Sequence, residues 1–378
     1  MKRQAGFSLM EVLVATALMV VIMGTTLRAL SDATHANEMV TLMADTQENL
    51  RAALNYMTKD LIEAGEGLPQ GGIPIPNSAT LLNPAPALAS AVNRPGPIGG
   101  PATFPPSFLT LPAVTDGFQL GPQAVTPNPN VPGGVLLGAR TDFITVVYVD
   151  NTIIDLVHNT TLSSLPIFLA ASGGNPGCPA GSLAPTGLTA IFDATCITLP
   201  TGNTAIAPGD LIMFQNANGA TLQTVTAVAG QTVTFAGGGA GDVFALNASG
   251  KPSGTITNML NPDGTFPPTT ASRVWMITYY LNTTNQQRPL LMRQVNFRPA
   301  TAVAEVIEDV SISYDINGGP PSYSGPIVPI YSPNAIRKVN LSIAARADNA
   351  YSQNKTYFRN NLQTQVSVRS LAFFNDFK

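Results

Sequence analysis

One carboxylate stands in a stretch that is otherwise free of charge. Between residues 7 and 27 the only charged residue is Glu11, and this run is about as long as the roughly 20 apolar residues that carry a helix across a bilayer. An unpaired carboxylate in such a segment costs on the order of a few kcal/mol, so ionisable residues there usually have a partner and a function. We therefore expect Glu11 to bind a cationic group once the segment leaves water.

Two simpler interpretations of the N-terminus stay open. A secretory signal has a basic start, a short apolar core and a small-x-small cleavage site after that core. Here the Ala-Thr-Ala triplet at residues 15–17 falls inside the apolar run, too early for such a site. A plain membrane anchor fits the length and the basic flank of Lys2 and Arg3, but it gives Glu11 no role.

The histidines and the glycine-rich run do not have the spacing of a catalytic or ligand-binding motif. His35 and His158 are isolated in the sequence and form neither an HExxH motif nor a catalytic triad. The run at residues 237–241 lacks the lysine and the Ser/Thr of a phosphate-binding loop, so we interpret it as a hairpin tip. The sequence thus predicts no catalytic residue and no cofactor, and an enzyme is not expected.

The acidic residues of the second half are also not spaced as a metal site. Asp142, Asp150 and Asp155 do not follow the spacing of a calcium loop. Glu308 and Asp309 are adjacent, and we expect them to cap or solvate the start of their segment. No metal site is predicted.

Cys178 and Cys196 are the only cysteines of the chain. An even number of cysteines in a chain whose bulk is expected outside the cytoplasm favours a disulfide. The loop that it closes would contribute about 3 kcal/mol in the chain-entropy model. Two unrelated buried thiols are the alternative, whereas two cysteines without neighbouring histidines do not make a zinc site.

Composition limits the class of protein. With 378 residues the chain is long enough for one large domain or two modest ones. Charged residues make up only 11% and the net charge is −3, so no basic surface for nucleic acid is expected. The 33 glycines and 32 prolines exceed average usage without marking the whole chain as disordered. These values are typical of an extracytoplasmic, β-rich protein with long loops.

Residues 7–64 are predicted to form one helix of about 87 Å, at 1.5 Å per residue. Apolar residues recur along its second half at steps of three, four or seven, which gives a one-sided stripe for packing on a globular domain. The stripe consists of Met39, Met43, Leu50, Leu54, Met57 and Leu61. The first half has no such asymmetry and no soluble partner, so the expected fold class is α+β, with a long spine helix on a β-rich head.

The remainder is expected to divide into an extended insertion and the head. Residues 65–134 hold fifteen of the 32 prolines, and their part beyond residue 67 has only Arg94 and Asp116 as charges, so a regular sheet or helix is not expected there. Residues 135–378 read as short strands with turn signals. The predicted strands are 141–149, 208–214, 221–228 and 231–235 joined at Gly230, 273–281, 290–294, 304–316 beginning as a helix or turn, 336–347 and 362–371.

The N-terminal order Lys-Arg-Gln-Ala-Gly, followed by Phe-Ser-Leu-Met-Glu, resembles the class III leader of type IV prepilins and pseudopilins. The resemblance implies that residues 1–6 are a leader removed by prepilin peptidase after Gly6. Phe7 would then be the new, N-methylated N-terminus and Glu11 the residue that directs filament assembly. The amino group created at Phe7 would pair with Glu11 of an adjoining subunit, which offsets the desolvation of both charges and selects register.

A second phrase narrows the resemblance. Residues 47–67, QENLRAALNYMTKDLIEAGEG, resemble PilW-type minor pilins, and J-type minor pseudopilins of type II secretion share much of the pattern. Residues 208–214, 275–281 and 362–373 also resemble segments of PilW-like proteins, and they occur in the same order along the chain. The resemblance implies a non-enzymatic subunit of the complex that primes pilus assembly and sits at the tip. A J-type pseudopilin and a tip adhesin remain the alternatives.

The same resemblance implies where the protein resides and what it contacts. It would be held in the bacterial inner membrane by one pass, with a periplasmic head, and then move into a pilus or pseudopilus filament. Its partners would be prepilin peptidase, the inner-membrane assembly platform, other minor and major pilins, and membrane lipid before assembly. Nucleic acid is not among them.

Overall fold

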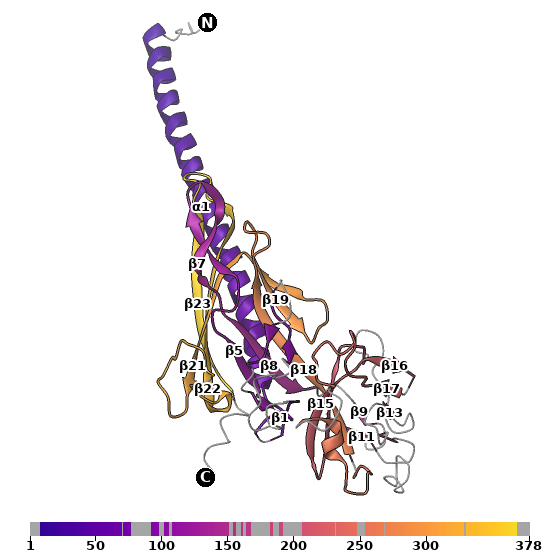
Figure 1. Ribbon diagram of the computed structural model, residues 1–378. Helices are drawn as coiled ribbons and strands as arrows, with labels where there is room; N and C mark the ends of the chain where they lie inside the picture. The colour runs from indigo at the N-terminus through magenta and orange to yellow at the C-terminus, as the bar shows by residue number, and fades with distance from the viewer. Residues whose placement is uncertain are drawn as a thin grey trace.

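A computed structural model describes the molecule as one long helix projecting from an elongated, β-rich head (Figure 1). It describes residues 8–69, 71–76, 92–97, 102–105, 108–150, 189–191, 206–230, 232–247, 254–267, 269–328 and 330–368, and the backbone of short strands at 154–155, 160–161, 164–167 and 182–183. The α+β class expected from the sequence is confirmed.

Helix α1, Leu9–Glu63, is continuous over 55 residues and about 82 Å long. Its first half is exposed, and its second half buries one face against the head. That face consists of Leu42, Thr46, Leu50, Ala53, Leu54, Met57, Asp60 and Leu61. The predicted helix is therefore confirmed over the described residues, and its apolar stripe is confirmed at Leu50, Leu54, Met57 and Leu61. Met43, which was also assigned to the stripe, is 39% exposed, and Met39 is only half-buried, because the head packs closely on the helix only farther along it.

The head is built on an antiparallel sheet in which β18 takes the central place. β18 pairs with β11 and β14 near its start and with β8 and β19 toward its end. Its β-branched and aromatic residues suit a strand with neighbours on both sides. The eight strands found in the described residues are β5 Val114–Gly117, β8 Phe143–Val149, β11 Ser164–Ile167, β14 Leu211–Asn216, β15 Gly219–Thr224, β18 Thr269–Asn282, β19 Leu290–Val295 and β20 Thr301–Glu305.

A three-stranded antiparallel sheet lies against α1 and consists of β21 Ile307–Ile316, β22 Ile336–Ala350 and β23 Tyr357–Ser367. Burial alternates along β21 and the first part of β22, as expected for strands with one buried face. Apolar residues of this sheet, of the central sheet and of α1 form one core cluster. The spine helix is therefore packed between two sheets along its second half.

Shorter elements complete the head. The β6–β7 hairpin lies near the point where α1 leaves the head, and the small sheet of β12, β13, β17 and β16 lies at the far end (Figure 1). β16 and β17 form a hairpin whose turn lies at Gly230, as predicted, but its first strand comprises only residues 227–229 and not 221–228. The bounds are β1 Ile73–Pro74, β2 Asn93–Arg94, β3 Ala102–Thr103, β4 Thr110–Leu111, β6 Gln123–Asn128, β7 Val131–Arg140, β9 Ile154–Asp155, β10 Thr160–Thr161, β12 Ser182–Leu183, β13 Thr189–Ile191, β16 Ala227–Ala229, β17 Thr232–Thr234, η3 Ile256–Met259 and η4 Pro333–Ala335.

Four secondary-structure predictions are wrong. The predicted strand 221–228 is divided between β15 and β16, which belong to different sheets. The run at residues 237–241 is not a hairpin tip, because in the described residues η3, and not a strand, is the next element after β17. Residues 65–134 were expected to lack regular sheet, yet β5 pairs with β8 in the central sheet and β6 pairs with β7, because strand pairing with distant partners overrides local composition. Residues 304–316 were expected to begin as a helix or turn, but β20 and β21 occupy them. The chain changes sheets between these strands at Val306, whose φ of +59° is rare for a β-branched residue.

Candidate functional site

Glu11 lies in the first turn of α1, where Ser8 caps the helix. Ser8 Oγ accepts a hydrogen bond from the Glu11 amide at 3.2 Å, and Glu11 Oε2 accepts one from the Ser8 amide at 3.4 Å. This reciprocal arrangement is a capping box, and the Ser-x-x-Glu spacing is the signal in the sequence that was missed. The carboxylate is also favoured by the positive end of the helix dipole. Its partner is thus a local and exposed backbone group.

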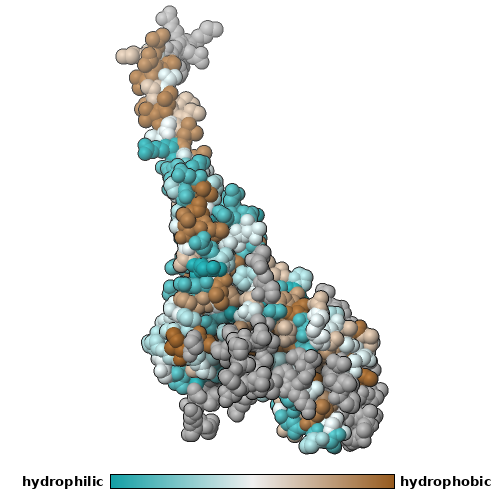
Figure 2. Space-filling model, in the orientation of Figure 1, coloured by the Kyte–Doolittle hydropathy of each residue, from teal (hydrophilic) through white to brown (hydrophobic). Residues whose placement is uncertain are grey.

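The surface around Glu11 is apolar and exposed. Leu9 is 84% exposed and Met10 72%, and every described residue as far as Thr34 is exposed. Figure 2 shows this apolar surface on the projecting part of the helix and a more polar surface where the head begins. Helix α1 is long and apolar enough to cross a membrane. Lipid or other apolar helices have to cover this surface, because an apolar area of this extent is unfavourable in water.

The other end of α1 carries a carboxylate in the opposite situation. Asp60 is buried and accepts four hydrogen bonds from the head. Its donors are the Tyr279 hydroxyl at 2.5 Å, the Tyr148 hydroxyl at 3.2 Å, and Arg293 through Nε at 2.8 Å and Nη2 at 3.2 Å. Since these donors come from β18, β8 and β19, the Asp60 network fixes the helix to three strands of the central sheet.

The electrostatics of the Asp60 network follow from burial beside a charge. Burial raises the pKa of both the Tyr279 and the Tyr148 hydroxyl above 10, and the nearby Asp60 charge raises it further. Burial alone would lower the pKa of Arg293, but the hydrogen bonds and charge of Asp60 outweigh it and raise that pKa. The two phenols therefore stay neutral and the guanidinium stays charged across the physiological range.

The point where α1 leaves the head is held by the turn between β22 and β23. The Ser352 amide donates to Glu38 Oε1 at 2.8 Å, and the Ser352 hydroxyl donates to Glu38 Oε2. The Tyr351 ring packs edge-on against His35, with ring centroids 5.9 Å apart. His35, isolated in the sequence, thus has a packing role here.

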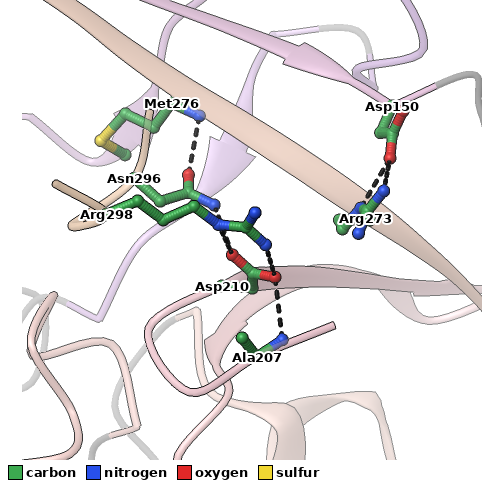
Figure 3. Close-up of polar contacts among 7 residues, drawn as sticks. All are labelled: Asp150, Ala207, Asp210, Arg273, Met276, Asn296 and Arg298. Carbon is green, nitrogen blue, oxygen red and sulfur yellow. Dashed lines mark hydrogen bonds and ion pairs between the residues drawn. The ribbon is translucent and has the colours of Figure 1, made fainter. Parts of the chain in front are cut away.

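Two ion pairs brace the central sheet at the ends of its strands (Figure 3). Arg273 Nε donates to Asp150 at 2.6 Å, and Arg298 binds Asp210 through Nη2 at 2.6 Å and Nε at 3.0 Å. The guanidinium carbons of Arg273 and Arg298 lie 4.4 Å and 5.2 Å from the centre of the Trp275 ring. Asp150 and Asp210 are buried and are engaged in these ion pairs, so their role is structural.

The only two charged residues of 68–134 meet inside the head. Arg94 Nη1 donates to the backbone oxygen of Asp116 at 2.8 Å, and the guanidinium carbon lies 4.5 Å from the centre of the Phe143 ring. Burial lowers the pKa of Arg94 to about 10, opposed by the Asp116 charge. Asp116 Oδ2 accepts from the Ile327 amide at 3.1 Å, so both charges support the packing of the extended stretch.

Glu308 corrects a prediction of the sequence. It is not a solvated cap but lies buried, where Arg346 Nε approaches it at 3.1 Å and Arg359 Nε donates to it at 2.8 Å. Burial raises the pKa of the Glu308 carboxyl, and the two guanidinium groups oppose this shift. Arg359 also donates to the backbone oxygen of Gly133, which ties the β6–β7 hairpin to the three-stranded sheet.

The remaining predicted site residues lie outside the described part of the chain. This applies to Gly6 and Phe7 of the cleavage site and to Cys178 and Cys196 of the predicted disulfide. His158 also falls there. Within the described ranges, no group of three or more His, Cys, Asp and Glu side chains is placed to hold a metal.

Comparison of the sequence with known protein families supports the prepilin-like leader expected at the N-terminus. The prokaryotic N-terminal methylation motif matches residues 1–27. This motif and the apolar helix that follows it support a type IV pilin-like protein. The motif implies processing by prepilin peptidase and assembly of this pilin-like chain with other pilins, and the apolar helix fits membrane anchoring and a pilus. No curated protein and no solved structure matches the chain.

Proposed function

We propose that the chain is a minor pilin, a non-enzymatic subunit that helps to initiate a type IV pilus and sits near its tip. One observation carries the proposal: residues 9–34 of α1 are exposed, residues 9–27 are apolar apart from Glu11 and three threonines, and Glu11 lies in the first turn. Such a helix has to be covered by lipid or by other helices. A filament core made of apolar helices supplies that cover.

Glu11 gives this cover its specificity. In the single chain its carboxylate is held only by the exposed amide of Ser8, at 3.4 Å. A charged amine at the mature N-terminus of an adjoining subunit forms a stronger, charge-assisted hydrogen bond than a neutral amide does. In the dry interior of a helical bundle, a Glu11 without this partner opposes docking by several kcal/mol. The pair thus selects the register of one helix against the next.

The size of the head favours a subunit that is present in few copies per filament. About 310 residues lie beyond the helix and include two sheets and a further small sheet at the far end. A body of this size is difficult to repeat at every position of a helical lattice. A subunit near the tip has free space in the direction away from the filament.

The resemblance of residues 47–67 to PilW-type minor pilins gains a physical basis in the structure. Met57, Asp60 and Leu61 of this phrase form the buried face of α1, and Asp60 binds the head. The phrase therefore describes how a spine helix docks on its head. PilW-like and J-type proteins share it, so it fits both a pilus and a type II secretion pseudopilus.

The proposal is tested by comparing Glu11→Ala with Glu48→Ala, which removes a carboxylate from an exposed position on the same helix. We expect Glu11→Ala to remain in the membrane fraction and to be lost from sheared filaments, whereas Glu48→Ala is incorporated like the original chain. Mass spectrometry of the mature N-terminus should show a methylated Phe7. Equal incorporation of the two variants would refute the assembly role of Glu11.

Deleting the gene separates the pilus from the secretion system. A minor pilin that primes assembly is expected to reduce piliation and leave protein secretion intact. Loss of secretion with normal piliation would favour the J-type pseudopilin. The adhesin alternative has no observation of its own, because the described parts of residues 65–134 supply buried core residues such as Val114 and Arg94.

A further inference from the structure

The free length of α1 nearly equals the thickness of a bilayer. His35 is the first described helix residue that is not exposed, and it contacts Tyr351 and Ser352 of the head. Residues 9–34 therefore project freely and span about 39 Å at 1.5 Å per residue. A bilayer measures about 40–45 Å when its headgroup layers are included. If the start of α1 lies at the cytoplasmic face, the near end of the head has no room to clear the headgroups of the opposite face.

Two hairpin ends form that near end, and we name them the collar: residues 127–132, which comprise the β6–β7 turn and the adjoining ends of both strands, and residues 351–356 between β22 and β23. Both lie beside α1 where it leaves the head (Figure 1). They line a common groove with Asn128, Asn130, Lys355, Thr356, Tyr357 and Arg359. The groove is thus placed at the level where lipid headgroups meet the protein.

The groove offers donors suited to a phosphate group. Arg359 is already bound to Glu308, and in the described part of the chain the exposed Lys355 ammonium has no ion-pair partner. A lysine ammonium binds phosphate as a point charge, and the side-chain amide nitrogens of Asn128 and Asn130 can donate beside it. The Thr356 hydroxyl already donates to Asn354 Oδ1 at 2.6 Å. Glu38 of the helix lies against the same turn, and Ser352 donates two hydrogen bonds to its carboxylate.

We propose that the collar is a phospholipid headgroup site, in which Lys355 and the polar groups of the β6–β7 turn bind lipid phosphate while the chain is held in the membrane. Tyr351 and Tyr357 flank Lys355 and are half-buried, and tyrosine is enriched at membrane interfaces together with lysine. The site rests on the proposed function only in requiring the membrane-held stage. Its role is to seat the head on the lipid surface and fix its height before assembly.

The test measures how well Lys355 is shielded by lipid. The full chain is reconstituted in vesicles of phosphatidylglycerol and phosphatidylcholine, labelled briefly with a water-soluble amine-acylating reagent, and compared with the same chain in neutral detergent. Lys338 is the internal reference, because its side chain is 44% exposed and it lies on β22 about 40 Å from the collar, at 3.3 Å per residue. We expect the ratio of Lys355 to Lys338 labelling to be about fivefold lower in vesicles than in detergent.

A helix-lengthening variant separates lipid contact from other causes of shielding. Seven alanines inserted between Thr34 and His35 add about 10 Å and nearly two full turns, so the collar keeps its structure and its side of the helix but is lifted from the bilayer. We expect labelling of Lys355 in this variant to return to the detergent value. Shielding that persists in the variant would overturn the proposal.

Two further outcomes would also overturn it. Equal labelling ratios in vesicles and in detergent would show that the collar does not meet lipid. Inorganic phosphate at millimolar concentration that shields Lys355 of the detergent-solubilised chain to the same extent would assign the groove to free phosphate. None of these results affects the Glu11 test, which measures incorporation into filaments. Failure of the lipid-site proposal and failure of the proposed function are therefore distinguishable.

Discussion

Replacing Asp60 with alanine should detach the spine helix from the head more effectively than any other single change in α1. The carboxylate is buried and is shared by Tyr279, Tyr148 and Arg293, which belong to three different strands. Asp60→Ala leaves a guanidinium and two hydroxyls without their acceptor. The alanine also cannot fill the space that the carboxylate leaves.

The size of the effect follows from how well water can replace the lost partner. Removing one member of a buried ion pair typically costs about 3–5 kcal/mol. The Arg293 side chain is 23% exposed, so water rehydrates part of it and the lower end of that range applies. We therefore expect a loss of about 3 kcal/mol, which corresponds to a fall in Tm of about 6–12 °C for a head of this size.

Trp275 provides the assay, because it is the only tryptophan and lies on β18 four residues before Tyr279. Urea unfolding of the full chain in neutral detergent is followed by its fluorescence. Asp45→Ala is the matched control, since it removes the same side chain from an exposed position of the same helix, and it should change stability by less than about 0.5 kcal/mol. A loss below about 1 kcal/mol for Asp60→Ala would refute the view that this network holds the helix.

Three further predictions follow from particular contacts. The pKa of Tyr279 and Tyr148 is raised above the ordinary value of 10.0, so their neutral hydroxyls stabilise the fold fully below pH 10, and this contribution is lost as the pH rises above 10. The urea midpoint should therefore fall as the pH rises above 10, and it should fall less steeply in Tyr279→Phe. Gly254→Ala should destabilise the head by about 2 kcal/mol more than Gly264→Ala in the same urea assay. Both glycines have φ near +80°, so the backbone strain is equal, but only at Gly254 would the new Cβ clash, 2.4 Å from the Ile75 carbonyl carbon. Ser352→Ala should speed amide hydrogen exchange of α1 around His35 and Glu38 without changing global stability, since it removes the hydroxyl contacts to Glu38 and His35 at one exposed turn and keeps the backbone amide bond to Glu38; unchanged exchange there would contradict the holding role of the Ser352 hydroxyl.

The spine helix was the most predictable element, because its information is local. The spacing of Leu50, Leu54, Met57 and Leu61 predicted both the helix and its buried face, and the structure buries all four. Asp60 was not recognised as part of that face. It lies three residues after Met57, and side chains three or four apart share one face of a helix. That spacing was the available signal, but the reason for burying a carboxylate lies in partners 88 to 233 residues away.

The errors in the head have the same cause. Composition argued against a sheet in residues 65–134, but β5 is stabilised by β8 and not by its own propensity. Glu308 was judged by its polar neighbour Asp309, while its cationic partners Arg346 and Arg359 come from other strands. In both places the deciding interaction is long-range, and a single sequence does not show which distant residue will supply it.

The two carboxylates at the ends of α1 divide folding from assembly. Asp60 has all its partners within the chain, four donors at 3.2 Å or less, so its charge is spent on fixing the helix to the head. Glu11 has a single exposed amide at 3.4 Å, so its charge remains available to another subunit. A change at Asp60 should therefore lower the stability of the isolated chain, and a change at Glu11 should leave that stability intact while removing the chain from filaments. If Glu11→Ala instead unfolded the head, the two ends of the helix would not act separately and the proposed division would fail.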